Sequence, residues 1–452
     1  MVRAMSEIFK AYDVRGLVPD QLDADLATSV GAAFVAVTEA GGGTVVVGHD
    51  MRASSPGLAQ AFADGASRAG ADVVMIGLSS TDQLYFASGR LGFPGAMFTA
   101  SHNPARYNGI KLCRAHAVPI GLDTGLAEIR DLAVSGGKSG GERVGDITEV
   151  DVLTDYADHL LSLVPVEGRR LKIVVDAGNG MAGHTAPAVL GKLDVELVPM
   201  YFELDGSFPN HEANPIEPAN TRDLQDRVRH EGADLGLAFD GDADRCFLID
   251  ERGEIVSPSV LTALIAAREL DREPGATVIH NLITSRAVPE IVRELGGIPV
   301  RTRVGHSFIK ATMAETNAIF GGEHSGHFYF RDFWRADSGM LAALHALAAL
   351  AGSEETMSAL LAKYSRFAAS GEINSEVGDQ DAVLSELGEQ YAETAGASVD
   401  HLDGLTVTHD DWWFNVRASN TEPLLRLNAE GKDEATMAQL RDDVMAAIRR
   451  AS

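Results

Sequence analysis

Two short segments of this chain, far apart in the sequence, carry side chains that could act together in catalysis. Thr99–Pro104 offers the hydroxyl of Ser101 at the end of an apolar run. Asp240–Arg245 places three carboxylates at alternate positions and follows them at once with an arginine. A hydroxyl nucleophile, a site for a hard cation and a fixed positive charge are the requirements of phosphoryl transfer. The two segments together therefore predict a phosphoryl-transfer site.

The serine segment needs its neighbours for this interpretation, because a lone serine after a strand is usually a turn or helix-cap residue. His102 and Asn103 supply hydrogen-bond donors, Pro104 stiffens the turn, and ligands bind at strand ends in open α/β sheets. Ser101 must be activated by a partner, or it can start the reaction already phosphorylated. Lys111, eight residues beyond Asn103, is a candidate to balance that charge or to carry a proton.

The acidic segment is the strongest local signal. Asp240, Asp242 and Asp244 can converge on one cation, and ligation by oxygen alone favours Mg²⁺ over zinc. A calcium-binding EF-hand is the obvious alternative, because Glu251 falls at loop position twelve. However, Arg245 stands at position six, where that loop needs a glycine, and an apolar strand follows it directly. We therefore predict a magnesium site, with Arg245 beside the metal to stabilise the transferring phosphate.

A third segment, Gly322–His327, combines a carboxylate, a hydroxyl and an imidazole between glycines. Glu323 and Ser325 stand at alternating positions, from which they can accept from and donate to neighbouring hydroxyls of a sugar. His327 can titrate near neutral pH and so can move a proton. A polar turn without function is the alternative for this segment.

The fourth segment runs from Arg417 to Pro423 and is rich in groups that bind phosphate. A guanidinium, two hydroxyls and an amide lie within five residues, and a second arginine follows on the next expected strand. Such a set can hold the three oxygens of a phosphate group. These candidate residues are Arg417, Ser419, Asn420, Thr421 and Arg426.

A glycine motif elsewhere points to a different class of protein, an NAD-dependent oxidoreductase. Gly178–Gly183 matches G-x-G-x-x-G between an expected strand and an expected helix, and Glu203 lies twenty residues further on. That interpretation leaves the serine, acidic and arginine segments without a role. We therefore interpret the glycines as a tight strand-to-helix turn.

The composition excludes several other classes. The 452 residues contain 65 acidic and 38 basic side chains, for a net charge of −27, which repels nucleic acids and anionic membranes. Cys113 and Cys246 are the only cysteines, which fits a reducing compartment and excludes a cysteine zinc site. No signal peptide or membrane-spanning run is visible, so we expect a cytoplasmic protein. A phosphorylated sugar would also be repelled, so its binding must come from local basic residues, backbone N–H groups and a metal.

The order of expected elements predicts an α/β protein with a different C-terminal part. Over about 370 residues, short apolar strands alternate with helical patterns, which predicts mostly parallel, buried strands in three related cycles. After about Gly371 the pattern changes to an antiparallel α+β arrangement. The expected strands are 44–48, 72–76, 95–99, 171–176, 195–199, 235–239, 277–282, 298–303, 405–409, 411–417 and 424–429. The expected helices are 55–69, 82–90, 153–163, one from about 183, 222–230, 260–270, 285–295, 306–314, 339–351, 379–394 and 435–450.

The four segments, in this order, resemble the motifs of the α-D-phosphohexomutase superfamily. Their residue sequences are similar to those of its bacterial phosphomannomutase/phosphoglucomutase branch. The resemblance begins at Phe9-Lys-Ala-Tyr-Asp-Val-Arg-Gly16 and reaches the last arginine segment. It implies three related α/β domains with mixed sheets plus a smaller C-terminal α+β domain, arranged around a central cleft, with the last domain mobile. We expect the domains at 1–145 (phosphoserine loop), 146–253 (metal-binding loop), 254–370 (sugar-binding loop) and 371–452 (phosphate-binding loop).

The resemblance also implies roles for individual residues. Ser101 would be the phosphoserine and, with Asp240, Asp242 and Asp244, would ligate one Mg²⁺ per chain. The sequence departs from the family at Arg303-Val-Gly-His306, where relatives have lysine before Thr-Gly-His. The candidate catalytic residues are Ser101, Lys111, Arg245, His327 and Arg15. The candidate substrate contacts are Tyr12, His102, Arg303, His306, Glu323, Ser325, Arg417, Ser419, Asn420, Thr421 and Arg426.

The expected activity is the interconversion of hexose 1-phosphate and hexose 6-phosphate, with mannose and glucose as sugars. A phosphoserine enzyme would pass its phosphoryl group to the sugar and take the other phosphate back, with hexose 1,6-bisphosphate as activator. We expect a monomer or a homodimer. The nearest alternative is a phosphoglucosamine mutase, against which His324 argues only weakly. A Mg²⁺-dependent phosphatase, the oxidoreductase above and a sugar-phosphate sensor without catalysis are further alternatives.

Overall fold

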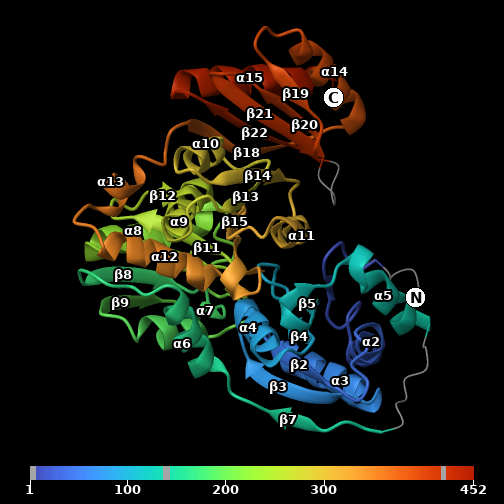
Figure 1. Cartoon of the computed structure of the whole chain (residues 1–452). Coiled ribbons are helices and arrows are strands. Elements are labelled where there is room, and N and C mark those ends of the chain that lie inside the picture. Colours follow the sequence, from blue (N-terminus) through green and yellow to red (C-terminus); the bar gives the residue numbers. More distant parts are fainter. Residues whose placement is uncertain (1–6, 136–142, 419–423, 452) are drawn as a thin grey trace.

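A computed structural model describes residues 7–135, 143–418 and 424–451 of the chain. In this part of the chain the strands form four sheets that follow one another along the sequence. Figure 1 shows the first sheet at the lower end of the molecule, the C-terminal sheet at the upper end and the other two between them. The predicted fold class, three α/β units and a C-terminal α+β unit, is confirmed.

The first sheet has the strand order β1-β5-β4-β2-β3-β7, and β6 pairs with β5. Its central strand β2 contacts both α3 and α4. Helix α4 begins after Ser80, whose side chain accepts a hydrogen bond from Gln83 N as a helix cap. The strands are Val14–Leu17 (β1), Thr44–His49 (β2), Asp72–Leu78 (β3), Gly95–Phe98 (β4), Tyr107–Arg114 (β5), Val118–Pro119 (β6) and Ile147–Glu149 (β7). The helices are Ala24–Val37 (α2), Ser55–Arg68 (α3), Thr81–Leu91 (α4) and Leu126–Ser135 (α5).

The second sheet has the order β12-β11-β10-β8-β9, and its strands β8 and β10 are apolar runs buried over almost their whole length. Such strands, covered on both faces, read as continuous hydrophobic runs in the sequence. The strands are Leu171–Asp176 (β8), Val195–Met200 (β9), Leu235–Phe239 (β10), Cys246–Asp250 (β11) and Ile255–Val256 (β12). The helices are Leu153–Leu163 (α6), Ala182–Leu190 (α7) and Arg222–Glu231 (α8).

The third sheet has the order β14-β13-β15-β16-β17. The same unit contains α12, a helix that is apolar all round, almost entirely buried and packed against α9 and against β11 of the second sheet. A helix of this kind belongs to the core of a large protein. The strands are Thr277–Asn281 (β13), Ile298–Thr302 (β14), Phe320–Gly322 (β15), Phe328–Phe330 (β16) and Ala336–Asp337 (β17). The helices are Pro258–Arg272 (α9), Ala287–Glu294 (α10), His306–Thr316 (α11), Gly339–Ala351 (α12) and Met357–Leu361 (α13).

The C-terminal sheet, β18-β22-β21-β20-β19, is antiparallel throughout, as predicted for this part of the chain. Its apolar residues form a cluster of their own, separate from the large cluster that the second and third sheets share with part of the first. The strands are Ala368–Glu376 (β18), Ser398–Asp400 (β19), Leu405–Thr408 (β20), Trp412–Ala418 (β21) and Leu424–Gly431 (β22). The helices are Gln380–Ala392 (α14) and Glu434–Ala451 (α15).

The first three sheets are mixed, as the family resemblance implied, and not mostly parallel, as the strand pattern alone predicted. In each, a parallel core continues into antiparallel strands; for example, β2 pairs in parallel with β3 and β4, whereas β5 is antiparallel to β4. The relative direction of consecutive strands follows from the segment that connects them. Helices connect the parallel strands, whereas short loops connect the antiparallel ones. These short loops are β4–β5, β10–β11 and β15–β16, and β21–β22 is the C-terminal equivalent. They contain the four segments that the sequence analysis singled out.

The first three units meet at one buried carboxylate, that of Asp82 on α4. It accepts hydrogen bonds from Ser80, from the hydroxyl of Tyr156 on α6 at 2.8 Å and from Ser338, the cap of α12, at 2.6 Å. Burial of this carboxyl raises its pKa from 3.8 to about 6, against the opposing effect of the three hydroxyl donors. Asp82 is therefore both a junction between units and a group whose ionisation opposes folding.

We expect Asp82→Asn to remove the decrease in the free energy of unfolding that ionisation of Asp82 causes as pH rises. The folded pKa lies above the unfolded one, so the folded state binds more protons and is most favoured below about pH 4. The contribution of Asp82 to the free energy of unfolding is lost as pH rises through about 6, and it amounts to about 3 kcal/mol at most. Urea unfolding at several pH values should show this decrease in the wild type and not in the variant. Asp72→Asn is the control, because the backbone N–H of Asp146 lowers the Asp72 pKa and gives the opposite slope.

Candidate active site

A cavity of about 330 Å³ lies where the first and second units meet the third. Its wall combines cationic, anionic and hydroxyl-bearing side chains, which suits a polar, charged ligand. Seven of the predicted site residues line it together with one of the predicted metal ligands. The lining residues are Lys10, Tyr12, Asp13, Arg15, Tyr85, Ser101, His102, Lys111, Leu112, Pro119, Asp244, Arg245, His327 and Asp337.

Ser101 lies in the β4–β5 loop, held in an unusual backbone conformation. Its φ is +48°, in the left-handed region that non-glycine residues rarely adopt, and its N–H donates to Oγ1 of Thr99 at 2.9 Å. The neighbouring metal loop approaches so closely that a Cβ at Gly241 would lie 2.3 Å from the carbonyl oxygen of Ser101. A glycine is therefore required at Gly241 for the two loops to pack.

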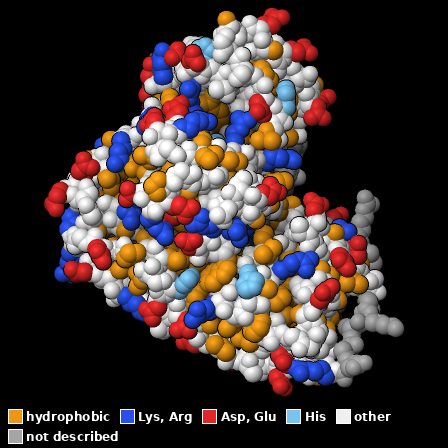
Figure 2. Space-filling model, in the orientation of Figure 1, with side chains coloured by type: hydrophobic (Ala, Val, Ile, Leu, Met, Phe, Trp, Pro, Cys, Tyr) orange, Lys and Arg blue, Asp and Glu red, His pale blue; other side chains and the backbone are white. Residues whose placement is uncertain are grey.

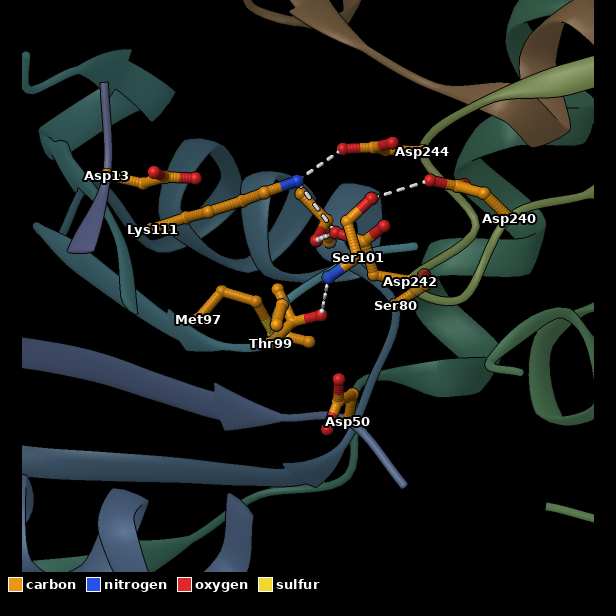
Figure 3. Close-up of polar contacts among 12 residues, drawn as sticks. Asp13, Asp50, Ser80, Met97, Thr99, Ser101, Lys111, Asp240, Asp242 and Asp244 are labelled. Atoms are coloured by element: carbon orange, nitrogen blue, oxygen red, sulfur yellow. Dashed lines mark hydrogen bonds and ion pairs between the residues drawn. The ribbon is translucent and has the colours of Figure 1, made fainter. Parts of the chain in front are cut away.

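The hydroxyl of Ser101 points at the acidic loop (Figure 3). Its Oγ donates to Oδ2 of Asp240 at 2.7 Å and lies 3.1 Å from Nδ1 of His102. Burial raises the pKa of Asp240, and the charges of Asp244 and Asp242 add to the rise, while Arg245 opposes it. A carboxylate thus stands in hydrogen-bond contact with the candidate nucleophile.

Lys111, on β5, joins the other two carboxylates of the acidic loop (Figure 3). Its Nζ donates to Oδ2 of Asp242 at 2.7 Å and to Oδ2 of Asp244, and Thr81 donates to the same Asp242 oxygen at 2.6 Å. Burial alone would lower the pKa of Lys111, but the two carboxylates raise it well above its ordinary value. Lys111 is therefore a fixed cation in this arrangement.

The acidic loop fits a hard divalent cation. One oxygen from each of Asp240, Asp242 and Asp244 lies within 4.8 Å of the other two. Oδ1 of Asp242 and Oδ1 of Asp244 are buried without a hydrogen-bond partner in the described part of the chain. Buried carboxylate oxygens normally have partners, so two orphaned ones beside a third carboxylate indicate a cation site. The strand after Arg245 is β11, which agrees with the exclusion of an EF-hand.

Arg245 and His327 are neighbours across two loops, since their backbones form an isolated antiparallel bridge. The Nε of Arg245 donates to Oδ2 of Asp240 at 2.9 Å, while its buried Nη2 has no partner among the described residues. Nε2 of His327 lies 3.6 Å from Oδ1 of Asp244, and its Nδ1 lies 3.0 Å from Oγ of Ser325. The guanidinium and the imidazole therefore both face the acidic loop.

Arg15 and Tyr12 line the cavity from the N-terminal part of the first unit. Arg15 donates to Oδ2 of Asp13 at 2.8 Å, to the carbonyl oxygen of Ala100 at 3.1 Å and to the side chain of Asn103. Burial raises the pKa of the Tyr12 hydroxyl, and burial lowers that of His102 well below its ordinary value. His102 is therefore neutral beside Ser101.

Glu323 lies behind the cavity wall in the β15–β16 loop, 3% exposed. Its Oε1 accepts from Asn281 at 3.1 Å and from the backbone of Gly305 at 3.3 Å, and its Oε2 accepts from Tyr329 at 2.7 Å. Oε1 therefore has both of its lone-pair sites occupied, whereas Oε2 can accept one further hydrogen bond. Arg303 is exposed, with its guanidinium 5.1 Å from the ring centre of Phe308, and does not line the cavity. The side chain of His306 lies outside the described structure.

The candidate phosphate-binding arginines of the C-terminal unit face each other across the sheet. Arg417 on β21 and Arg426 on β22 are paired in register, and each donates to the carboxylate of Glu372 at 3.2 Å. The Nε atoms of both arginines are buried without a partner among the described residues. Two guanidinium groups thus share one carboxylate and retain donors for an anion. The predicted Ser419, Asn420 and Thr421 lie outside the described residues.

Comparison with known proteins identifies the family. Models of its four domains match in order, as phosphoglucomutase/phosphomannomutase alpha/beta/alpha domain I at residues 6–137, domain II at 154–253, domain III at 258–367 and the C-terminal domain at 372–447. The chain belongs to the phosphoglucomutase/phosphomannomutase family. Membership makes it an enzyme, an isomerase that transfers a phosphoryl group within a hexose phosphate, and confirms the resemblance.

Relatives within the phosphoglucomutase/phosphomannomutase family match nearly the whole chain. A protein named phosphohexose mutases from Xanthomonas campestris pv. campestris is 41% identical over 96% of this chain and 97% of its own length. A phosphomannomutase from Escherichia coli is 40% identical over 98% of this chain and 99% of its own length. A crystal structure of a family protein from Burkholderia thailandensis has a TM-score of 0.90 at 36% identity, covering 98% and 97% of the two chains.

The two main alternatives of function are weaker within this family. An N-acetylphosphoglucosamine mutase from Aspergillus fumigatus shares the fold, with a TM-score of 0.60 at 15% identity over 100% of this chain and 98% of its own. The amino-sugar alternative is not favoured, because relatives about 40% identical over nearly the whole chain are named phosphomannomutase. The glycine motif forms the turn between β8 and α7, as predicted. There a Cβ at Gly183 would lie 2.3 Å from the carbonyl oxygen of Phe202, so close packing explains the glycine.

Several residues of this phosphohexomutase site were missed by the sequence analysis. Tyr85 on α4 and Asp337 on β17 line the cavity, and Arg52 donates to the backbone of the serine loop. None stands in a recognisable motif or beside the four segments in the sequence. Only the long-range packing of the units brings them to the site, so no local signal could have found them.

The surface adds two observations. In Figure 2 acidic and basic side chains are interspersed on the visible face, so the excess negative charge forms no single patch there. No helix in the described part of the chain is long and apolar enough to cross a membrane.

Proposed function

We propose that this phosphohexomutase is a phosphomannomutase that also accepts glucose phosphates. The observation that carries the reaction is the Ser101 hydroxyl, 2.7 Å from Asp240 in an acidic loop where Asp242 and Asp244 each have a buried oxygen without a hydrogen-bond partner among the described residues. Ser101 and Asp244 line the same cavity. The choice of mannose is supported by relatives about 40% identical over nearly the full length, which are named phosphomannomutase. Hexose 1,6-bisphosphate is the proposed activator.

In the proposed reaction the phosphorylated Ser101 gives its phosphoryl group to the free hydroxyl of a hexose phosphate, and the other phosphate of the resulting bisphosphate returns to Ser101. Arg245, with an unused buried donor, stabilises the charge on the transferring group. Asp240, Asp242 and Asp244, with the phosphate on Ser101, would hold Mg²⁺, which when bound neutralises charge on the phosphoryl oxygens.

The proton carrier in this proposal is His327 rather than Lys111. Asp242 and Asp244 raise the pKa of Lys111 well above its ordinary value, so Lys111 keeps its proton and serves as fixed positive charge. His327 lies beside Asp244 and lines the cavity, and an imidazole can both accept and release a proton near neutral pH. Arg15 would hold the serine loop through Ala100 and Asn103.

The remaining predicted residues are proposed as substrate contacts. Glu323 and Ser325 would bind sugar hydroxyls, with Tyr12 and His102 at the cavity wall. The phosphate that does not react would be held by the C-terminal arginine loop. That group comprises Arg417, Ser419, Asn420, Thr421 and Arg426, and Arg303 and His306 are proposed as further substrate contacts. Each loop would come from one domain, at 1–145, 146–253, 254–370 and 371–452.

The test is ³¹P NMR of mannose 1-phosphate incubated with the protein, Mg²⁺ and a trace of hexose 1,6-bisphosphate. Mannose 6-phosphate should appear without free phosphate. Release of free phosphate would instead indicate a phosphatase. Turnover of glucosamine phosphate with no turnover of mannose phosphate would replace the proposed substrate with the amino sugar.

We expect Arg417→Ala to raise KM for mannose 1-phosphate by about 10- to 100-fold with a smaller change in kcat. The arginine would bind the phosphate that does not react, so its contribution is similar in the ground state and the transition state. Steady-state kinetics measure both constants, and Arg441→Ala on the exposed face of α15 is the matched control. A fall in kcat at unchanged KM would contradict this role.

A further inference from the structure

Arg52, between β2 and α3, has all of its side-chain donors satisfied by one loop and one carboxylate. Its Nε donates to Asp50 at 3.2 Å. Its Nη1 donates to the carbonyl oxygens of Pro104 and Tyr107, each at 3.0 Å. Its Nη2 donates to those of Ser101 at 2.8 Å and Asn103 at 2.7 Å. The five N–H groups of a guanidinium are thereby used in full.

Four carbonyl groups of the serine loop therefore converge on one buried side chain, which is 1% exposed. The carbonyl oxygen of Pro104 also accepts from the N–H of Tyr107 at 3.0 Å, so the guanidinium reinforces a turn that the backbone itself closes. The left-handed conformation of Ser101 adds strain that its surroundings must overcome. The guanidinium fork matches four separate acceptors, which the single ammonium of a lysine cannot do.

The charge of Arg52 is balanced first by Asp50, and Asp242 of the acidic loop is a further electrostatic partner. Its guanidinium is paired with Asp50, which is fully buried and lies beneath Thr99 in Figure 3. Arg52 does not line the cavity that contains Ser101 and Lys111. All of its side-chain hydrogen bonds go to Asp50 and to backbone carbonyls at Ser101 to Tyr107, so its geometric effect on phosphoryl transfer passes through that loop.

We propose that Arg52 is a positioning residue that fixes the serine loop, so that Oγ of Ser101 stays aimed at the acidic loop in each half of the reaction. This inference rests on the proposed role of Ser101 as the phosphorylated residue. Two residues of the second unit also pack against Arg52 and, with the hydrogen bonds to the serine loop, complete what we call the Arg52 clamp. The ring centre of Phe208 lies 5.2 Å from the guanidinium carbon of Arg52, and a Cβ at Gly206 would lie 2.6 Å from its Cα.

The test compares Arg52→Lys and Arg52→Gln with the wild type in kinetics and in ³¹P NMR of the phosphorylated enzyme. We expect kcat to fall by about 100-fold while KM for hexose 1-phosphate changes by less than about 3-fold, because the misplaced group is the nucleophile. We expect one sharp phosphoserine resonance in the wild type and a broadened or split resonance in both variants. Arg106→Lys is the control, because this exposed arginine of the same loop packs on Tyr107 and should behave as wild type.

Three outcomes decide the inference. A folded Arg52→Lys protein with wild-type kcat and a sharp resonance would overturn it, as would a loss confined to KM. If neither Arg52 variant folds, Phe208→Leu tests the same clamp from the second unit, and unchanged kcat and line width in that variant would overturn it. Ser101→Ala, measured in parallel, distinguishes failure of the proposed function from failure of the inference about Arg52. Full activity of Ser101→Ala would refute the proposed function itself, independently of Arg52.

Discussion

Replacing Ser101 with alanine should lower turnover of hexose phosphates by at least about 10⁴-fold while leaving their binding within about 3-fold. The reason is that the phosphoryl group would have no acceptor on the enzyme, while the groups proposed to bind the sugar and the second phosphate are untouched. Turnover is measured by a coupled assay, and binding of mannose 1-phosphate by calorimetry. The variant should also take up no ³²P from labelled hexose bisphosphate.

The matched control for this prediction is Ser54→Ala. Ser54 lies at the start of α3 and contacts the side chain of Asn108, outside the cavity. It should keep wild-type turnover. Retention of full activity by Ser101→Ala would instead exclude Ser101 as the nucleophile, whatever the behaviour of the control.

Asp244→Asn should lower kcat by about 10²- to 10³-fold and raise the Mg²⁺ concentration needed for half-maximal activity by more than about 10-fold. Oδ1 of Asp244 is one of the two buried carboxylate oxygens in the acidic loop without a hydrogen-bond partner among the described residues, and its Oδ2 accepts from Lys111. An amide keeps the shape but removes a charge from both the cation site and Lys111. Removal of Mg²⁺ with EDTA should abolish wild-type activity, and added Mg²⁺ should restore it.

Asp223→Asn is the control here, because Asp223 lies on the exposed face of α8 in the same unit and contacts Tyr201. Its Mg²⁺ dependence should equal that of the wild type. Titration of Mg²⁺ by calorimetry gives an independent readout. Equal Mg²⁺ affinity for Asp244→Asn and wild type would exclude Asp244 as a ligand.

The sequence predicted the elements well where burial dominates the pattern. The apolar runs 171–176 and 235–239 became β8 and β10 with the expected bounds, because a strand covered on both faces needs apolar side chains throughout. β5 was missed because Tyr107–Arg114 mixes apolar residues with Asn108, Lys111 and Arg114. Those polar side chains serve the serine loop and the cavity, so function obscured the pattern.

The local sequence pattern does not indicate whether neighbouring strands pair in parallel or antiparallel. Whether β5 runs parallel or antiparallel to β4 depends on the path of the connection, and the short loop that carries Ser101 was recognised only for its chemistry. The fact that all four such loops follow the same kind of hairpin connection emerges only in three dimensions.

Site residues that stand close together in the sequence could be predicted from their types and spacing. Contacts between residues of different units could not be predicted from the sequence. Ser101 and the acidic triad form local constellations, and the structure brings them together at 2.7 Å. Arg303 was predicted as a substrate contact from the family pattern, whereas in this structure it is exposed beside Phe308. Its role stays a prediction, as do those of Ser419 to Thr421.

The separate apolar cluster of the C-terminal unit affects how unfolding can be followed. The chain has three tryptophans, and two of them, Trp412 and Trp413, lie on β21 of that unit. The third, Trp334, packs against the large shared cluster. Intrinsic fluorescence therefore draws two of its three emitters from the smallest unit, whose core can melt on its own. A fluorescence midpoint would report that unit first, whereas far-ultraviolet circular dichroism would follow the bulk of the helices.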